Sequence, residues 1–405
     1  MSGTDTRRTA ARLVGRIIDG GAYANVVVPR RAFADRRDQA FMRRLVLTTV
    51  RMLSRVDRAV ATIADRPMTA IDPDLRNLLR TGATELLFLR SPPRAVVHTT
   101  VSIAAALRPR AAGFVNAVLR ELARQGEPPL PAGPEGAALR HGVPGWIYEA
   151  LVDQWGADRT GRFLEASNQE APLTIRARRP GFTHRRPVPG IDGAYVVDDA
   201  RRLDGIDPTS FTYTDPASVA VGIAMGIRPG DAVADLAAAP GGKTLHLWDQ
   251  AGPAGLVVAL DVHRRRVRSG RSRLRRLGAD VPWIIADAAA IPLRRGAVDR
   301  VLLDAPCTGL GTLRRRPEIR HRLDPEAPKR FARRQRELLT SALGSRPTRL
   351  VYSVCTVFAA ETVEVIEGLG GRPPDGLPGE RWGDGLLLAP DTTGTDGMFI
   401  AVFDR

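Results

Sequence analysis

The chain has 405 residues, of which 43% are hydrophobic, and a formal net charge of +16 at neutral pH. This size and composition support two or three domains with buried cores. No run of about 18 apolar residues is present, and the Arg-bearing start lacks the apolar core of a secretory signal. We therefore expect a cytoplasmic protein without membrane-spanning segments.

The positive charge is concentrated at the front of the chain. Residues 1–124 contain 22 Arg, no Lys and 10 acidic residues, a net charge of +12, whereas the remaining residues contribute +4. Genome composition is a second explanation for the preference for Arg over Lys, but it does not explain this uneven distribution. A basic region beside a nearly neutral one favours a phosphate-rich partner. We expect RNA, although composition alone does not separate RNA from DNA.

Residues 1–125 show helical periodicity and predict an all-α domain. Two apolar stripes carry the pattern and are expected to form its core: Leu75, Leu78, Leu79, Leu86 and Leu87, then Val115, Val118, Leu119 and Leu122. Residues 126–137 are rich in Pro and Gly and predict a linker. Residues 138–157 are again helical in pattern, and 172–197 are short, β-like and Arg-rich. Residues 138–214 are thus expected to form a connecting helix and a small α+β subdomain.

From residue 215 to 405, predicted strands alternate with helices. The expected strands are 232–236, 256–260, 283–287, 299–304, 349–354 and 398–403. This alternation predicts a mostly parallel, doubly wound sheet, a Rossmann-like α/β domain. Acidic residues end the first four strands: Asp235, Asp261, Asp287 and Asp304. A single Asp there is usually a helix cap, but four on successive strands are expected to line one crevice.

The segment after the first of these strands predicts a tight turn that leads into a helix. Its small residues and glycines allow the backbone to approach a ligand, and the helix start offers free N–H groups. The segment is not a phosphate loop, because Ala237 stands where that motif requires glycine, and G-x-G-x-x-G is also absent. A nucleotide-like ligand without a polyphosphate remains, with S-adenosylmethionine as the leading candidate. Asp261, at the end of the second strand, is placed to accept hydrogen bonds from ribose hydroxyls.

The chain has two cysteines, and each ends a strand-like apolar segment. Cys307 lies three residues after Asp304, and Cys355 directly follows the strand 349–354. Two thiols at one edge of a sheet suggest covalent catalysis. A disulfide is disfavoured without a secretory signal, and structural zinc would need more grouped Cys and His ligands, so no metal site is predicted. Inert buried thiols remain the alternative, and the spacing leaves the two interpretations open.

Three segments resemble, in order, the signature blocks of the Sun/RsmB family of RNA cytosine-5 methyltransferases. They are Ala-Ala-Pro-Gly-Gly-Lys-Thr at 238–244, Asp-Ala-Pro-Cys-Thr-Gly-Leu-Gly at 304–311 and Tyr-Ser-Val-Cys-Thr at 352–356. Residues 331–342 and 396–401 extend the resemblance, and Phe-Val-Asn-Ala-Val-Leu-Arg at 114–120 is similar to the NusB-like domain of the RsmB subgroup. Departures occur at Ala237, Thr214 and Arg178, where the family has Cys, Gln and Asn, and at 361–363, where Glu-Thr-Val replaces Glu-Asn-Glu.

The resemblance implies S-adenosylmethionine-dependent methylation of carbon 5 of a cytosine in RNA. It assigns the nucleophile to Cys355 and assistance in product release to Cys307, although residue spacing alone would have selected Cys307, which is nearer to Asp304. Asp304 is expected to bind the cytosine edge near ring nitrogen 3, and Asp287 to lie near the adenine. The implied cofactor-binding residues are Ala237, Ala238, Ala239, Pro240, Gly241, Gly242, Lys243, Asp261, Asp287 and Asp304.

The resemblance also bears on the substrate. The NusB-like front domain favours small-subunit ribosomal RNA, the β-like segment 172–197 is assigned to a substrate-positioning subdomain, and a monomer is expected. Basic residues that follow Cys307 are candidates for RNA contact: Arg314, Arg315, Arg316 and Arg320. The eight arginines between Arg264 and Arg276 are a weaker candidate, because they fit a solvated helix face. The alternatives are a tRNA methyltransferase of the same chemistry and a non-catalytic RNA-binding ribosome-assembly factor.

Overall fold

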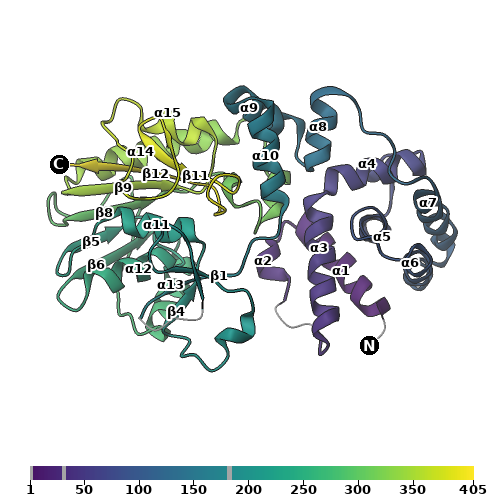
Figure 1. Cartoon of the computed structure of the whole chain (residues 1–405), viewed down its shortest axis with the longest axis horizontal. Coiled ribbons are helices and arrows are strands. Elements are labelled where there is room, and N and C mark those ends of the chain that lie inside the picture. Colours follow the sequence, from purple (N-terminus) through teal and green to yellow (C-terminus); the bar gives the residue numbers. More distant parts are fainter. Residues whose placement is uncertain (1–2, 30–32, 180–184) are drawn as a thin grey trace. The chain divides into compact units, whose positions relative to one another are not determined.

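The computed structural model describes residues 3–29, 33–179 and 185–405. The chain forms two compact units, and each consists of two chain segments (Figure 1). Unit 1 comprises Met1–Asn168 and Arg315–Leu323, and unit 2 comprises Gln169–Arg314 and Asp324–Arg405. The region 138–214, expected as one connecting segment, is therefore divided between the two units. In the described part of the chain, no helix is long and apolar enough to cross a membrane.

Unit 1 is helical, as predicted for its first 125 residues. Its helices are α1 (Gly3–Ile18), α2 (Ala24–Val27), α3 (Arg36–Arg51), α4 (Leu53–Ala64), α5 (Pro73–Leu87), α6 (Pro93–Leu107), α7 (Ala112–Gln125), α8 (Gly133–His141), α9 (Gly145–Trp155) and α10 (Ala157–Asn168), with short 3₁₀ turns η1 (Met68–Ala70), η2 (Pro109–Ala111) and η5 (Pro317–His321). Asp72 caps α5, and Pro73 fits its first turn because its missing N–H would have no intrahelical partner. The expected linker 126–137 runs into α8.

The core of unit 1 contains both predicted apolar stripes. Leu75, Leu78 and Leu79 are buried, and Leu86 and Leu87 pack against the same cluster. The second stripe, from Val115 to Leu122, is buried in that cluster too. A second cluster joins α1, α2 and α3, and Leu13 and Leu45 lie within it. The helical periodicity therefore identified core positions.

Unit 2 contains two sheets. The smaller has the order β2-β3-β1-β4 and is antiparallel: β1 (Thr174–Ala177), β2 (Arg186–Pro187), β3 (Ala194–Val196) and β4 (Phe211–Tyr213). Its Arg176 and Arg178 form ion pairs with Asp249 of α12 (Gly242–Ala251), at 2.6 and 2.8 Å. Arg178 also donates to the carbonyl oxygens of Thr209 and Leu277. The departure from the family at Arg178 thus ties the small sheet to the larger domain.

The larger sheet has the order β10-β11-β12-β9-β8-β5-β6-β7. Its strands are β5 (Ala232–Asp235), β6 (Leu256–Asp261), β7 (Trp283–Ile285), β8 (Arg300–Asp304), β9 (Arg349–Val354), β10 (Glu380–Trp382), β11 (Gly385–Leu388) and β12 (Met398–Asp404). The run from β9 to β7 is parallel, and β10, β11 and β12 are antiparallel. The six predicted strands and the mostly parallel sheet are confirmed, whereas β10 and β11 were not predicted.

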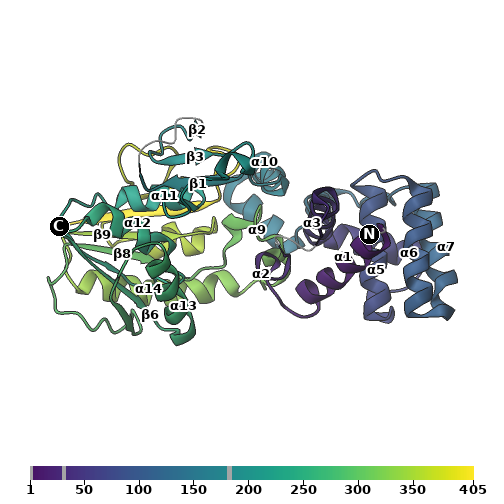
Figure 2. The ribbon, with the colours of Figure 1, turned by 90° about the horizontal axis from the view of Figure 1, so that it is seen from below.

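The helices of unit 2 are α11 (Pro216–Ala224), α12, α13 (Arg264–Arg276), α14 (Ala327–Gly344) and α15 (Val363–Ile366), with 3₁₀ turns η3 (Ala200–Leu203), η4 (Leu310–Thr312) and η6 (Ala359–Glu361) (Figure 2). Of these helices, α12, α13 and α14 connect parallel strands of the large sheet. α11 packs against α12, and α14 packs against β8 and β9. Val233, Leu302 and Val351 lie in the buried core of the sheet. This core fixes the strand ends from which the candidate site is built.

Candidate active site

The carboxyl ends of β5, β6, β8 and β9 place the predicted site residues at one edge of the sheet. Asp235, Asp261 and Asp304 are the last residues of their strands, and Cys355 follows β9 directly. Parallel pairing sets their relative positions, because Asp304 is level with Ser353 of β9 and Asp235 is level with Leu302 of β8. These residues therefore lie along the same edge of the sheet.

The two cysteines lie next to each other at this edge. The Sγ atoms of Cys307 and Cys355 are 3.3 Å apart, and both residues are free thiols of intermediate exposure. The Cys355 thiol beside it and burial raise the pKa of Cys307, and the negative charges of Glu361 and Asp304 act in the same direction. Cys307 is therefore held as a neutral thiol at neutral pH, and a neutral thiol is a weak nucleophile.

Asp304 is fixed beside the cysteines by two side chains. Lys243 Nζ donates to Asp304 Oδ2 at 2.7 Å, and Ser353 Oγ donates to Asp304 Oδ1 at 2.8 Å. Burial lowers the pKa of Lys243, but the neighbouring negative charges, that of Asp304 first among them, outweigh this effect and raise it, so Lys243 is an ammonium at neutral pH. The structure thus gives Lys243 a defined partner, and it is not a freely solvated lysine. A carboxylate held in this way is oriented before any substrate arrives.

A buried carboxylate that the sequence did not identify as functional connects the loops of both cysteines. Glu361 is fully buried and accepts hydrogen bonds from Thr308, Thr356 and Gln335. The only sequence signal was the single acidic residue that remains where the related family has Glu-Asn-Glu. Since its partners lie up to 53 positions away in the chain, spacing did not reveal this role.

The turn between β5 and α12 forms a backbone cradle next to Asp304. Gly241 has a φ of +91°, and a Cβ atom there would lie 2.4 Å from Leu274 Cδ1, so a larger residue does not fit. Ala239 N donates to Asp261 Oδ2 at 3.2 Å, and His263 N donates to Asp261 Oδ1 at 2.8 Å. These bonds orient the Asp261 carboxylate, which retains further acceptor positions for a ligand.

Asp235, at the base of this cradle, has one carboxylate oxygen without a hydrogen-bond donor in the part of the chain that the structure describes. Its Oδ2 accepts from Thr244 Oγ1 at 2.7 Å, whereas its buried Oδ1 has no hydrogen-bond partner among the described residues. Burial raises the pKa of Asp235 to about 7. A carboxyl group that ionises near neutral pH and has an open acceptor suits a cationic ligand group.

A pH-dependent stability is expected from Asp235 in the ligand-free protein. The folded state holds its proton up to about pH 7, whereas the ordinary pKa is 3.8, so the free energy of unfolding falls as pH rises through this window. Asp235→Asn removes this dependence and gains up to about 4 kcal/mol relative to wild type between pH 4 and 8. Chemical denaturation of both proteins across this range measures the difference.

Asp287→Asn is the matched control for this measurement. The hydrogen bond from Arg334 lowers the pKa of Asp287, so its contribution is already complete above pH 5 and is lost only as pH falls further. The difference between Asp287→Asn and wild type should therefore be constant from pH 5 to 8. An equally constant difference for Asp235→Asn would contradict the protonated state of Asp235.

Asp287 lies outside the strand in which it was predicted. β7 ends at Ile285, and Asp287 follows in a turn where it accepts from Ala289 N at 2.9 Å. Arg334 of α14 forms an ion pair with the same carboxylate. Asp287 is partly exposed, so it remains available to a ligand beyond the end of β7.

The four arginines predicted to contact RNA occupy different environments. Arg320 is fully buried in unit 1 and donates to the carbonyl oxygens of Arg51 and His141, at 3.1 and 3.0 Å, and burial lowers its pKa to about 9. Arg314 is also buried and donates to Gly394 O at 2.8 Å. These two arginines hold backbone in place, contrary to the expected RNA contacts. Arg316 is exposed and Arg315 is half-buried, so both can still reach a ligand.

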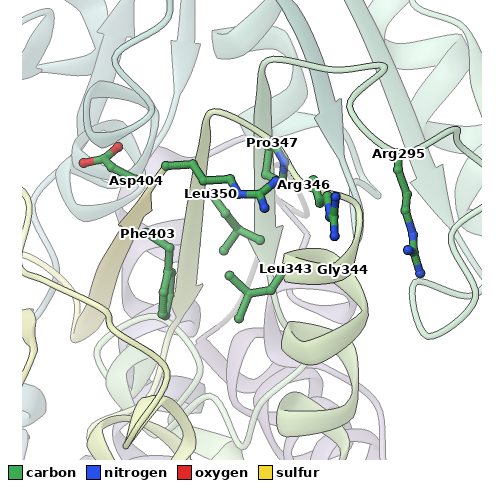
Figure 3. A pocket seen from close by; sticks show the side chains of 9 residues that line it. Arg295, Leu343, Gly344, Arg346, Pro347, Leu350, Phe403 and Asp404 are labelled. Carbon is green, nitrogen blue, oxygen red and sulfur yellow. The ribbon is translucent and has the colours of Figure 1, made fainter.

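A pocket of about 380 Å³ lies at the other edge of the large sheet (Figure 3). Arg295, Arg346 and Phe403 line it with Leu350, near the start of β9. Because parallel strands run from this edge toward the cysteines, the pocket is separated from the candidate site by the length of the strands. No predicted site residue lines it. Among the described residues, no group of three or more His, Cys, Asp or Glu is arranged to hold a metal ion.

Comparisons with known proteins identify the family and the fold. The family description "16S rRNA methyltransferase RsmB/F" matches residues 223–404, and the NusB family matches residues 4–124. Ribosomal RNA small subunit methyltransferase B of Sodalis glossinidius is 31% identical over 98% of this chain and 96% of the relative. The enzyme of the same name from Thermus thermophilus is 35% identical over 92% and 89%. The crystal structure of PH0851 is 22% identical and shares the fold, with a TM-score of 0.84 over 100% of this chain and 99% of that one. The chain thus belongs to the RsmB family of rRNA methyltransferases.

Proposed function

We propose that this protein methylates carbon 5 of a specific cytosine in small-subunit ribosomal RNA, with S-adenosylmethionine as methyl donor and Cys355 as covalent nucleophile. The observation that carries the proposal is the pair of free thiols 3.3 Å apart beside a carboxylate held by Lys243 and Ser353. Covalent addition to a pyrimidine ring needs both a nucleophile and a group that assists its departure. Inert core thiols do not require an oriented carboxylate beside them.

The cradle residues fit S-adenosylmethionine. When bound, it supplies an electrophilic methyl group on a sulfonium centre. The turn from Ala237 to Lys243 would hold its methionine part, and the open Oδ1 of Asp235 suits the ammonium group. Asp261 would accept hydrogen bonds from the ribose hydroxyls, and Asp287 would lie near the adenine. The orphaned acceptor supports this fit.

The chain's own groups account for activation of the cytosine. Carbon 5 is a weak nucleophile, and addition of the Cys355 thiolate to carbon 6 makes it enamine-like. Asp304 would hydrogen-bond the ring near nitrogen 3 and stabilise the charge that develops there. A base such as solvent water then accepts the carbon 5 proton, and the electrons of that C–H bond re-form the double bond between carbons 5 and 6 as the Cys355 thiolate departs. Cys307 lies beside that sulfur and is the group proposed to assist release.

The RNA substrate is supported by charge and by the relatives. Residues 1–124 carry +12 of the net charge, and they match the NusB family. Two full-length relatives are named as small-subunit rRNA methyltransferases. Arg315 and Arg316 follow the segment that carries Cys307 in the chain and are the proposed RNA contacts. The proposal places the protein in the cytoplasm as a monomer.

Bisulfite sequencing of total RNA from a deletion strain tests this function. Loss of one protected cytosine in small-subunit rRNA, restored by the wild-type gene, is the expected result. A lost signal in tRNA would identify the same chemistry on another substrate. No lost signal in any RNA, with cofactor binding retained by the purified protein, would support a non-catalytic assembly factor instead.

A further inference from the structure

We propose that Glu361 is a positioning residue that fixes the positions of the two cysteines relative to each other. The inference rests on the proposed function, because it concerns the two thiols assigned there. Glu361 lies in η6, which follows closely after β9 and Cys355. It is far along the chain from β8 and Cys307. It is nevertheless bonded to the loops of both.

The hydrogen bonds of Glu361 reach the residue that follows each cysteine. Glu361 Oε1 accepts from Thr308 Oγ1 at 2.5 Å and from Thr356 Oγ1 at 3.1 Å. Glu361 Oε2 accepts from Thr308 N at 2.9 Å. The two threonine hydroxyls also lie 2.8 Å from each other. One carboxylate therefore holds the residue that follows each cysteine, Thr308 through its backbone and side chain and Thr356 through its side chain.

α14 supplies a third support through Gln335. Its Nε2 donates to Glu361 Oε2 at 3.0 Å and to Pro306 O at 2.9 Å, so it also holds the residue before Cys307. The hydroxyl of Tyr352 donates to Glu361 O at 2.8 Å and fixes the backbone of Glu361 itself. The Cys307 loop is thus held on both sides of the cysteine.

Burial separates this role from direct catalysis. Glu361, Thr356 and Gln335 are 0% exposed, and Thr308 is 5% exposed. The carboxylate is enclosed by donors, so it acts through the loops and not on the substrate. A buried carboxylate is costly unless several donors satisfy it, and Glu361 has four. Such a group is retained where it specifies a geometry.

The charge of Glu361 has a secondary effect on the thiols. The hydrogen bond with Cys355 and burial are the main reasons why the pKa of Cys307 is raised, and the Glu361 carboxylate adds to them. Glu361 thereby helps to keep Cys307 protonated while Cys355 reacts. Positioning and charge make separable predictions, because glutamine preserves the shape of the side chain without its charge.

Glu361→Ala and Glu361→Gln separate these effects, and Glu364→Gln, an exposed acid three residues away, is the control. In Glu361→Gln the amide oxygen accepts from Thr308 N and Gln335, and its NH₂ group donates to the threonine hydroxyls, which reorient. We expect kcat to fall about 100-fold in Glu361→Ala and less than about tenfold in Glu361→Gln, with KM for RNA unchanged in both. In Glu361→Gln, Cys307 loses a neighbouring negative charge, which lowers its pKa. The pH at which the methylation rate falls because Cys307 loses its proton should therefore be lower than in wild type.

A second readout does not depend on methyl transfer. Diamide oxidises two adjacent thiols to a disulfide and takes up both electrons and both protons as it becomes a hydrazine. Disulfide formation between Cys307 and Cys355, followed by mass spectrometry, should be at least about tenfold slower in Glu361→Ala than in wild type. Glu364→Gln should react at the wild-type rate, and Glu361→Gln at that rate or faster, because loss of the neighbouring charge raises the thiolate fraction of Cys307.

These results distinguish failure of the inference from failure of the proposed function. If wild type methylates no cytosine, the diamide rates still report whether Glu361 positions the thiols. Equal rates in Glu361→Ala and wild type, or an unchanged kcat in folded Glu361→Ala, would overturn the inference. If Glu361→Ala does not fold, Thr356→Val removes one of the bonds, and both rates should fall by an intermediate factor. Wild-type rates in folded Thr356→Val would count against the inference in the same way.

Discussion

Cys355→Ala is expected to abolish methyl transfer and to form no covalent RNA adduct, whereas Cys307→Ala should accumulate one. The nucleophile acts before the methyl group is transferred, so its loss stops the reaction at the start, with a fall in rate of about 10⁴-fold or more. The release group acts afterwards. Without Cys307, the Cys355 thiolate still adds to carbon 6, and the reaction stalls with the RNA attached.

The two substitutions are matched controls for each other. Neither cysteine forms a disulfide, their Sγ atoms are 3.3 Å apart, and each change removes one sulfur of intermediate exposure. Differences between the variants therefore reflect chemical role more than packing. The measurement is a denaturing gel of protein and RNA after incubation with a labelled methyl donor, in which the Cys307→Ala adduct should carry the label.

Two outcomes would change the assignment. An adduct in Cys355→Ala and none in Cys307→Ala would exchange the two roles, which is the order that spacing from Asp304 alone suggested. Substantial activity in both variants without any adduct would remove covalent catalysis from the proposed function. The family membership would stand in either case, since it rests on similarity over nearly the whole chain.

The sequence predicted those parts of the fold that depend on local pattern. Apolar segments identified β5, β6, β8 and β9, because buried parallel strands need continuous apolar residues. β10 and β11 were missed because they form a short antiparallel hairpin, three and four residues long, whose stability depends on pairing with β12. β7 ends two residues earlier than predicted, since propensity does not fix strand boundaries.

Long-range contacts set the limits of prediction within the site. The two cysteines and Asp304 were identifiable because each ends a strand. Glu361 was not, because its role depends on bonds to residues on separate elements. Arg320 belongs to a basic run that suggested RNA contact, yet its guanidinium is buried against distant backbone carbonyls in unit 1. A run of charged residues in a sequence does not show which of their side chains are buried and which reach solvent.

Asp304→Asn is expected to lower kcat about 1,000-fold while the protein remains folded, because the oriented carboxylate is lost from the site of charge development. The amide retains the shape of the side chain but not its charge, so the Lys243 ammonium loses its ionic partner. Burial then acts on Lys243 with less compensation, which favours a lower pKa. Because the pair is partly exposed to solvent, the loss of stability should be only about 2 kcal/mol.

Ser353→Ala is the matched control, because it removes the other hydrogen bond to Asp304 and leaves the charge in place. Its rate should fall by no more than about tenfold, corresponding to about 1 kcal/mol for one neutral donor. Single-turnover methylation at saturating RNA and methyl donor measures both variants, and calorimetry checks that the donor still binds. If Ser353→Ala is as slow as Asp304→Asn, the contribution of Asp304 is its orientation and not its charge. A nearly wild-type rate in Asp304→Asn would exclude Asp304 from catalysis. The orientation of its carboxylate by Lys243 and Ser353 would then have a structural role only.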